Sequence, residues 1–219
     1  MQKLEKIAEQ IHKDFEAHTA ARDQALTHAR TLTRHCAQAI RAVHRDEKDV
    51  ARQLLDDAGK LAEALRGSAK EYPNVYYAGY SQDALKEYAE AHIVYALIDN
   101  GKLPTPQDLG LENATYLKGL SEAVGEMRRR CLDILRSGHS VEVERLLEHM
   151  NDIYAVLVTM DYPDAVTGGL RRLTDISRSL IERTRGDITV SVRQERLETQ
   201  LRNVEELLEK QPAKMPEDG

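Results

Sequence analysis

Two glutamates in this sequence have the spacing and the surroundings of metal ligands. Glu87 and Glu90 lie one helical turn apart at the start of a segment that then becomes almost wholly apolar, and Asp83 adds a third acid one turn earlier. The positions four residues after the two glutamates are Ala91 and Val94, so neither has the cation that commonly follows an acid on an exposed helix. Acids that enter an apolar helix without a counter-charge are unfavourable unless a cation meets them, and a divalent metal ion is one such cation.

A second pair, Glu122 and Glu126, lies four residues apart and therefore on one face of a predicted helix. If the two acid-bearing helices pack antiparallel, all four carboxylates converge. Clustered carboxylates bind Mg²⁺ or Mn²⁺, and these ions support phosphodiester hydrolysis by activating water and neutralising phosphate charge. The alternative is an ordinary surface, because Glu126 has Arg130 four residues on. Both interpretations stay open on the pattern alone.

Other catalytic arrangements find little support in the sequence. It contains no Gly-x-Ser-x-Gly motif, no Gly-rich phosphate loop and no Cys-x-x-Cys. A ferritin-like di-iron site needs a Glu-x-x-His pair on each of two helices, and the chain offers only Glu9 with His12. His92 falls on an apolar helix face, so we expect a packed histidine rather than a general base.

Arginines form a second candidate surface. They recur along one face of the first predicted helix, and a run of three directly follows Glu126 and Met127. Such side chains contact phosphates in nucleic-acid-binding proteins, but they also form salt-bridged surfaces and subunit interfaces. The residues that we expect to contact nucleic acid are Arg30, Arg34, Arg128 and Arg129.

The composition is that of a helix-rich protein. The 219 residues are 41% hydrophobic and 31% charged, with only 12 glycines and 6 prolines. A net charge of −6 argues against bulk nonspecific binding to nucleic acid, although a local basic surface remains compatible with it. Cys36 and Cys131 both fall on apolar helix faces, which favours reduced, buried thiols and a cytoplasmic location. No apolar run approaches the length that spans a membrane.

Apolar residues at intervals of three and four predict seven helices, over residues 3–45, 47–66, 76–99, 113–137, 140–160, 164–185 and 188–210. Gly186-Asp187 is predicted to separate the last two helices, and Gly168-Gly169 to let two helices approach closely. The first helix would be roughly 60 Å long, so part of it is expected to pack on another subunit. Residues 1–210 are expected to form one all-helical domain, followed by a disordered tail at 211–219.

Several stretches together resemble the translin family, and within it the translin-associated-factor branch. The best markers are residues 85–91 (Leu-Lys-Glu-Tyr-Ala-Glu-Ala) and 116–127, which carry the two acid pairs. Asp161-Tyr162-Pro163-Asp164 followed by Leu170-Arg171-Arg172, and then residues 183–186, are similar to the C-terminal helices of the family. The resemblance runs from about Arg22 to Thr189, nearly the whole chain.

The resemblance implies a seven-helix bundle that assembles into a hollow homo-oligomer of octamer type and binds single-stranded RNA or DNA. For the associated-factor branch it implies Mg²⁺-dependent endonuclease action on RNA inside the shell. Glu87, Glu90, Glu122 and Glu126 stand at the branch's acidic positions, although the branch usually has Asp at the third. We therefore expect a metal-dependent ribonuclease in which Glu87, Glu90 and Glu122 hold Mg²⁺ or Mn²⁺ and Glu126 is a further ligand or an orienting residue.

Two other functions remain open on the sequence. One is a translin-like shell that binds single-stranded nucleic acid without cleaving it. The other is a purely structural helical oligomer, in which the acids are surface groups.

Overall fold

Helices form all of the regular structure in the part of the chain that the computed structural model describes, residues 2–68, 71–138 and 140–209. Six long helices make up the body of the molecule: α1 (Gln2–His44), α2 (Lys48–Gly67), α4 (Gly79–Ile98), α6 (Asn113–Leu135), α7 (Val141–Val158) and α9 (Leu170–Glu209). Three one-turn helices lie in the connections: α3 (Pro73–Tyr76), α5 (Pro106–Leu109) and α8 (Asp164–Thr167). The predicted all-α fold is confirmed.

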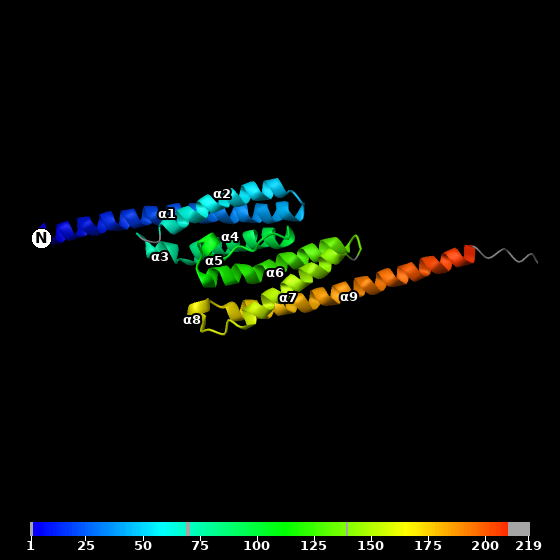
Figure 1. Ribbon diagram of the computed structural model, residues 1–219. Helices are drawn as coiled ribbons and strands as arrows, with labels where there is room; N and C mark the ends of the chain where they lie inside the picture. The colour runs from blue at the N-terminus through cyan, green and yellow to red at the C-terminus, as the bar shows by residue number, and fades with distance from the viewer. Residues whose placement is uncertain (1, 69–70, 139, 210–219) are drawn as a thin grey trace, which may run out of the picture.

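The long helices stack in three layers (Figure 1), with α1 and α2 in the first, α4 and α6 in the middle, and α7 and α9 in the third. The middle layer is the core, because α4 packs against α1 and α2 on one side while α6 packs against α7 and α9 on the other. Among the described helices, none has the length and the apolar character needed to cross a membrane. Cys36 and Cys131 are free and buried, which agrees with the prediction of unpaired thiols.

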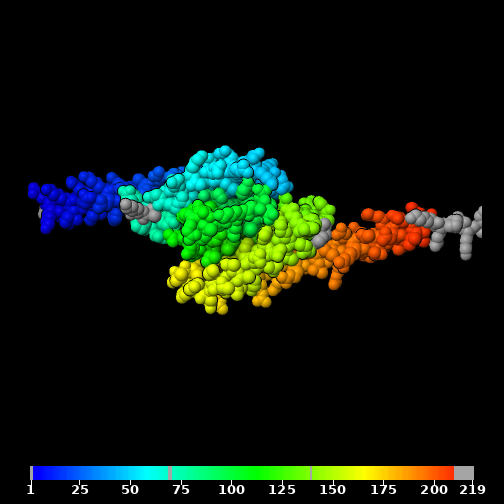
Figure 2. All heavy atoms as spheres, viewed as in Figure 1, coloured from blue at the N-terminus to red at the C-terminus, as the bar shows by residue number. Residues whose placement is uncertain are grey.

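The two terminal helices extend beyond the bundle at opposite ends (Figures 1 and 2). The apolar face of α1 is buried from Ala25 to Val43, where α2 and α4 cover it. In the projecting half of the same helix, Leu4 and Phe15 are 65% and 67% exposed. An apolar stripe therefore continues past the bundle, and its contact with another subunit stays a prediction.

Five of the predicted helices agree with the structure to within a few residues, namely those over 3–45, 47–66, 76–99, 113–137 and 140–160. The predicted boundary at Gly186-Asp187 is wrong, because α9 runs through it without a break. Contacts on both sides hold the helix there: Thr184 and Ile188 are buried, and Asp187 is paired with Arg128 of α6 at 2.8 Å. These contacts outweigh the roughly 1 kcal/mol that a glycine costs inside a helix.

The break instead lies at Gly168-Gly169, which was predicted inside a helix. Both glycines have positive φ, 59° and 87°, a backbone conformation that other residues adopt at a cost. They end α8 and redirect the chain into α9. The predicted tail at 211–219 lies outside the described residues.

The α4 and α6 helices run in the same direction, not antiparallel, the arrangement from which the sequence predicted that the four acids converge. Thr115 near the start of α6 donates a hydrogen bond to Gln82 near the start of α4 at 2.6 Å, and Gly119 one turn later faces Ala89 and Glu90. The ribbon shows the two helices running in the same direction (Figure 1). The 99–112 connection, which contains α5, returns the chain to the end of the bundle where α4 began.

Gly119 is the point of closest approach between these helices. A Cβ at this position would lie 2.6 Å from the Ala89 Cβ, 2.8 Å from the Lys86 carbonyl oxygen and 2.9 Å from the Glu90 amide nitrogen. Two of these atoms belong to the backbone, so no side-chain rotation relieves the clash. The absence of a side chain at Gly119 therefore sets the spacing of the middle layer.

Replacing Gly119 with alanine is expected to destabilise the protein by about 1–3 kcal/mol, because α4 and α6 must separate. The matched control is Gly125→Ala in the same helix, where the new Cβ would meet only Leu180 Cδ1 at 3.9 Å. That control should be neutral or slightly stabilising. Thermal unfolding followed by circular dichroism measures both, and equal melting temperatures for the two variants would contradict the assigned role of Gly119.

Candidate metal centre

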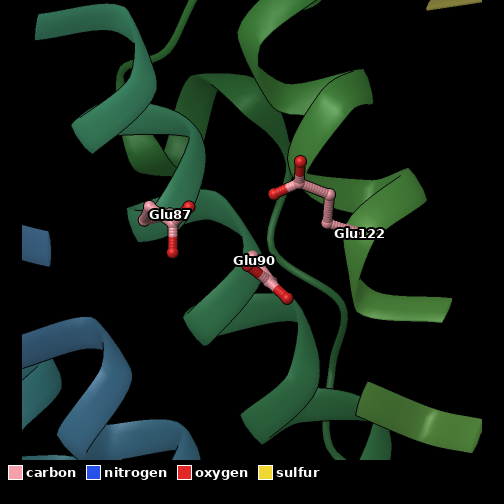
Figure 3. A group of neighbouring side chains, drawn as sticks. All are labelled: Glu87, Glu90 and Glu122. Carbon is pink, nitrogen blue, oxygen red and sulfur yellow. The ribbon is translucent and has the colours of Figure 1, made fainter. Parts of the chain in front are cut away.

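Three glutamates from the two middle helices meet at one place. Glu87 and Glu90 project from α4 and Glu122 from α6 into the same space (Figure 3), and one carboxylate oxygen from each lies within 4.8 Å of the others. Glu90 is only 8% exposed, whereas the other two side chains are about a third exposed or less. The cluster therefore has one buried acid at its base and two at its rim.

Glu90 lies at the base of the cluster because α4 is surrounded. Its neighbours Ala89 and Ala91 are fully buried, and α1, α2 and α6 all pack on this helix. Small side chains on α4 let α6 come close, which brings Glu122, one turn after Gly119, to the level of Glu90. The position of the acids thus follows from the packing of the middle layer.

Burial, followed by the negative charges of Glu87 and Glu122, raises the pKa of Glu90 to about 8. No hydrogen bond or ion pair to the Glu90 carboxylate is found among the described residues. The charges of the cluster also act on α1: burial, together with the nearby charges of Glu87 and Glu90, raises the pKa of the Cys36 thiol. The cluster is therefore a region of strongly negative potential in the metal-free protein.

Among the described residues, a lysine is the only cation that contacts any of the three acids, and it contacts two of them. The Lys86 Nζ lies 2.8 Å from Oε1 and 2.7 Å from Oε2 of Glu122, and 3.2 Å from Oε1 of Glu87. Burial lowers the pKa of Lys86, but the hydrogen bonds and charges of these carboxylates outweigh it and leave the pKa above its ordinary value. The expectation that neither acid of α4 has a local counter-charge is therefore wrong for Glu87, whereas Glu90 contacts no cation among the described residues.

Glu126 lies apart from the three-glutamate cluster. This residue lies one turn beyond Glu122 on α6 and meets the end of α1, where its Oε2 is 2.6 Å from Nε2 of His44. The hydrogen bond with His44 is the main reason why the pKa of Glu126 is lowered. Glu126 is still near enough for its charge to raise the pKa of Glu90.

The residues present fit a hard divalent cation. Carboxylate oxygens are the preferred protein ligands of Mg²⁺ and Mn²⁺, and the cluster offers three carboxylates within a few ångströms. An ammonium group already bridges two of them, which shows that the site accepts a cation. Glu90 is buried and pairs with none of the described residues, so a bound ion would stabilise its charged form.

The fold and the sequence are those of known proteins. The chain superposes on the structure of AfC3PO in complex with duplex RNA with a TM-score of 0.78 and 33% sequence identity, over 84% of this chain and 95% of that one. A second AfC3PO crystal structure gives the same TM-score at 32% identity. The chain belongs to the C3PO family of translin and translin-associated-factor homologues.

Two other comparisons agree with this membership. Apo-NeC3PO has the same fold, with a TM-score of 0.78, at 19% identity over 84% of this chain. The uncharacterized protein MJ0175 of Methanocaldococcus jannaschii is 32% identical over 188 residues, which cover 85% of this chain and 83% of that protein. No family model matches the chain. The resemblance to the translin family predicted from the sequence is thus confirmed.

The predicted RNA-binding arginines of this C3PO homologue lie in different environments. Arg30 and Arg34 are exposed on α1 and have no ion-pair partner among the described residues. Arg129 is 54% exposed and lies 3.6 Å from Glu126. Arg128 instead packs between α6 and α9, where it pairs with Asp187 at 2.8 Å and donates a hydrogen bond to Thr184 at 3.0 Å. Three of the four are thus accessible, and Arg128 joins two helices.

Sequence reasoning overlooked two residues of the site, Lys86 and His44. Lys86 lies four residues before Glu90, whereas the sequence pattern considered only cations four residues after each acid. His44 pairs with Glu126, 82 residues away, and no local pattern in the sequence indicates this contact. His92 packs against Tyr88, with ring centroids 4.5 Å apart, and burial lowers its pKa to about 4, in line with the predicted packed histidine.

The raised pKa of Glu90 predicts how the stability of the metal-free protein depends on pH. The folded state holds a proton on Glu90 up to about pH 8, whereas the unfolded chain releases it near its ordinary pKa of 4.5. Because the folded state binds more protons in this window, stability falls as the pH rises from about 5 to 9. Glu90→Gln should therefore raise the melting temperature in chelator, more at pH 9 than at pH 5.

The matched control for this experiment is Asp83→Asn, an exposed acid at the start of the same helix. It should change the melting temperature little at either pH. A Glu90→Gln effect of the same size at pH 5 and pH 9 would contradict the assigned protonation of Glu90.

Proposed function

We propose that this chain is a metal-dependent endoribonuclease that acts within an oligomeric shell. The observation that carries the proposal is the convergence of Glu87, Glu90 and Glu122 in a chain that belongs to the C3PO family. That AfC3PO was solved with duplex RNA supports RNA as the substrate class. The negative cluster and the accessible arginines are the two parts that such an enzyme needs.

In this proposal Glu87, Glu90 and Glu122 hold Mg²⁺ or Mn²⁺. The ion, when bound, supplies activation of the attacking water and stabilisation of the charge that develops on the phosphate. Glu90 would hold the ion as a carboxylate, with its proton released to solvent. Glu126 stays ionised and accepts a hydrogen bond on its Oε2 from Nε2 of His44, which fixes its orientation beside the other acids.

The RNA backbone would lie along α1 and the exposed end of α6. Arg30, Arg34 and Arg129 are the accessible cations of the predicted set, and they offset a net charge of −6 where the substrate approaches. The sequence resemblance implied single-stranded RNA, with DNA as a further ligand, whereas AfC3PO binds duplex RNA. Both forms of RNA therefore belong in the assay.

The shell is part of the same proposal. A hollow homo-oligomer of octamer type in the cytoplasm would enclose the site and would bury the apolar stripe that extends along α1 beyond the bundle, where Ile7 and Ile11 are each nearly half exposed. Native mass spectrometry of the purified protein gives the copy number, and a monomer at micromolar concentration would contradict the shell.

Cleavage of labelled RNA tests the catalytic assignment. With Mg²⁺, the wild-type protein should cut a labelled single strand or duplex, and chelator should stop it. Glu90→Gln should lower the rate by on the order of 100-fold or more, because a ligand and its charge are lost while the shape is kept. Denaturing gel electrophoresis of the products measures the rate.

Asp83→Asn is the control, because this acid lies on the same helix but outside the three-glutamate cluster. Its rate should match that of the wild type. Equal cleavage by Glu90→Gln and wild type would remove the assigned role of Glu90. Tight RNA binding that chelator leaves unchanged, with no product, would instead indicate a binding shell without catalysis.

The arginines can be tested separately from the acids. Arg30→Gln with Arg34→Gln should weaken RNA binding and reduce the slope of log K against log salt concentration by about 0.7–0.9 for each phosphate that the variant no longer neutralises. Arg128→Gln should instead lower the melting temperature, because it leaves Asp187 without its partner. Fluorescence anisotropy over a salt series makes the comparison. An unchanged slope in the double variant would contradict a phosphate-contacting role on α1.

A further inference from the structure

Lys86 is the cation that the carboxylate cluster contacts in the absence of metal. Its ammonium lies within 3.2 Å of oxygens from both rim glutamates, Glu87 and Glu122, and its side chain is only 17% exposed. It joins the two helices of the middle layer across the mouth of the cluster. No contact of this kind reaches Glu90 among the described residues.

The ammonium and a divalent ion would compete for the same two carboxylates. Lys86 lies within hydrogen-bond distance of both oxygens of Glu122 and of Oε1 of Glu87, so a metal held by these two residues would have to displace it from at least part of these contacts. Two cations at adjacent sites repel each other strongly in a partly buried environment. Lysine can yield, because its charge sits at the end of a flexible four-carbon chain.

We propose that Lys86 is an internal counter-ion of the metal centre, which holds Glu87 and Glu122 together in the metal-free protein and leaves them when the divalent ion binds. This inference rests on the proposed function, because it needs the three glutamates to be metal ligands. Lys86 would hold the metal site together before the ion binds. The free energy needed to displace Lys86 would then lower the affinity for the metal.

The counter-ion has two opposing effects. In the metal-free protein it neutralises part of the repulsion among the three acids, so it stabilises the fold. When metal binds, breaking its contacts opposes the ion, so it weakens binding. A lysine elsewhere on the surface would neither reduce the repulsion among these acids nor weaken the binding of the ion.

The variant Lys86→Met keeps the approximate length of the side chain and removes the charge. Titration calorimetry with Mn²⁺ should give a dissociation constant lower than that of wild type by about tenfold, the scale of one removed charge–charge repulsion. In chelator the melting temperature of Lys86→Met should be lower than that of wild type. Saturating Mn²⁺ should raise the melting temperature of the variant by more than it raises that of wild type. Lys60→Met is the control, because Lys60 pairs with Asp57 on α2, outside the cluster, and should leave the Mn²⁺ affinity unchanged.

Displacement can also be observed in the wild-type protein. Acetylation of lysines by a water-soluble ester, read by mass spectrometry, should be faster at Lys86 when Mn²⁺ is saturating, and unchanged at Lys60. Mn²⁺ affinity of Lys86→Met equal to or weaker than that of wild type, or acetylation of Lys86 that Mn²⁺ leaves unchanged, would overturn the exchange while leaving the metal centre intact. If neither wild type nor Lys86→Met binds Mn²⁺, the metal centre itself fails, and the exchange fails with it.

Discussion

The contact between Gly119 and the backbone of α4 is the constraint on which the candidate site depends. The two middle helices lie too close at this point to admit any side chain. A Cβ on residue 119 would come within 3 Å of the Lys86 carbonyl oxygen and the Glu90 amide nitrogen. One turn further along α6, the same close approach brings Glu122 to Glu87 and Glu90. A looser packing would leave these acids to solvent on separate helices, where each would be an ordinary surface group. The geometry of the site is thus a consequence of how the core packs.

Charged residues of α6 form ion pairs and hydrogen bonds with several other elements of the bundle. Four charged residues of α6 near the site have a partner on a different element: Glu122 contacts Lys86 on α4, Glu126 contacts His44 on α1, Arg130 contacts Asp46 after α1, and Arg128 contacts Asp187 on α9. Removing one partner from such a buried or half-buried pair costs more than a surface ion pair is worth, because the other charge stays desolvated. This arrangement explains why the run of three arginines at 128–130 is not a uniform basic patch. Only Arg129 among them remains largely exposed.

The sequence was sufficient for five of the long helices and for the acid pair on α4, because both are local patterns. Three- and four-residue spacing locates α1, α2, α4, α6 and α7, and the absence of a following cation marks Glu87 and Glu90. It was insufficient where long-range contacts decide. Asp187 has the sequence features of a helix start, but its pairing with Arg128 holds it inside α9. Glu126 was predicted as a further ligand or an orienting residue, and nothing in its own helix indicated the contact with His44. Whether two helices pack parallel or antiparallel depends on the connection between them. The spacing of apolar residues within either helix does not indicate which of the two occurs.

Charge also constrains the order of events in the proposed reaction. The three glutamates are opposed by one ammonium among the described residues, so a phosphodiester that approaches the metal-free site meets a net negative potential. The exposed arginines on α1 can hold the RNA backbone at a distance, but they cannot bring a phosphate into contact with Glu90, which is buried at the base of the cluster. A divalent ion held by the three carboxylates would cancel two of their three negative charges, and the ammonium of Lys86 nearby would offset the third. In the proposed reaction the ion would therefore bind before a phosphate approaches the cluster, because the clustered acids repel the phosphate until their charge is neutralised.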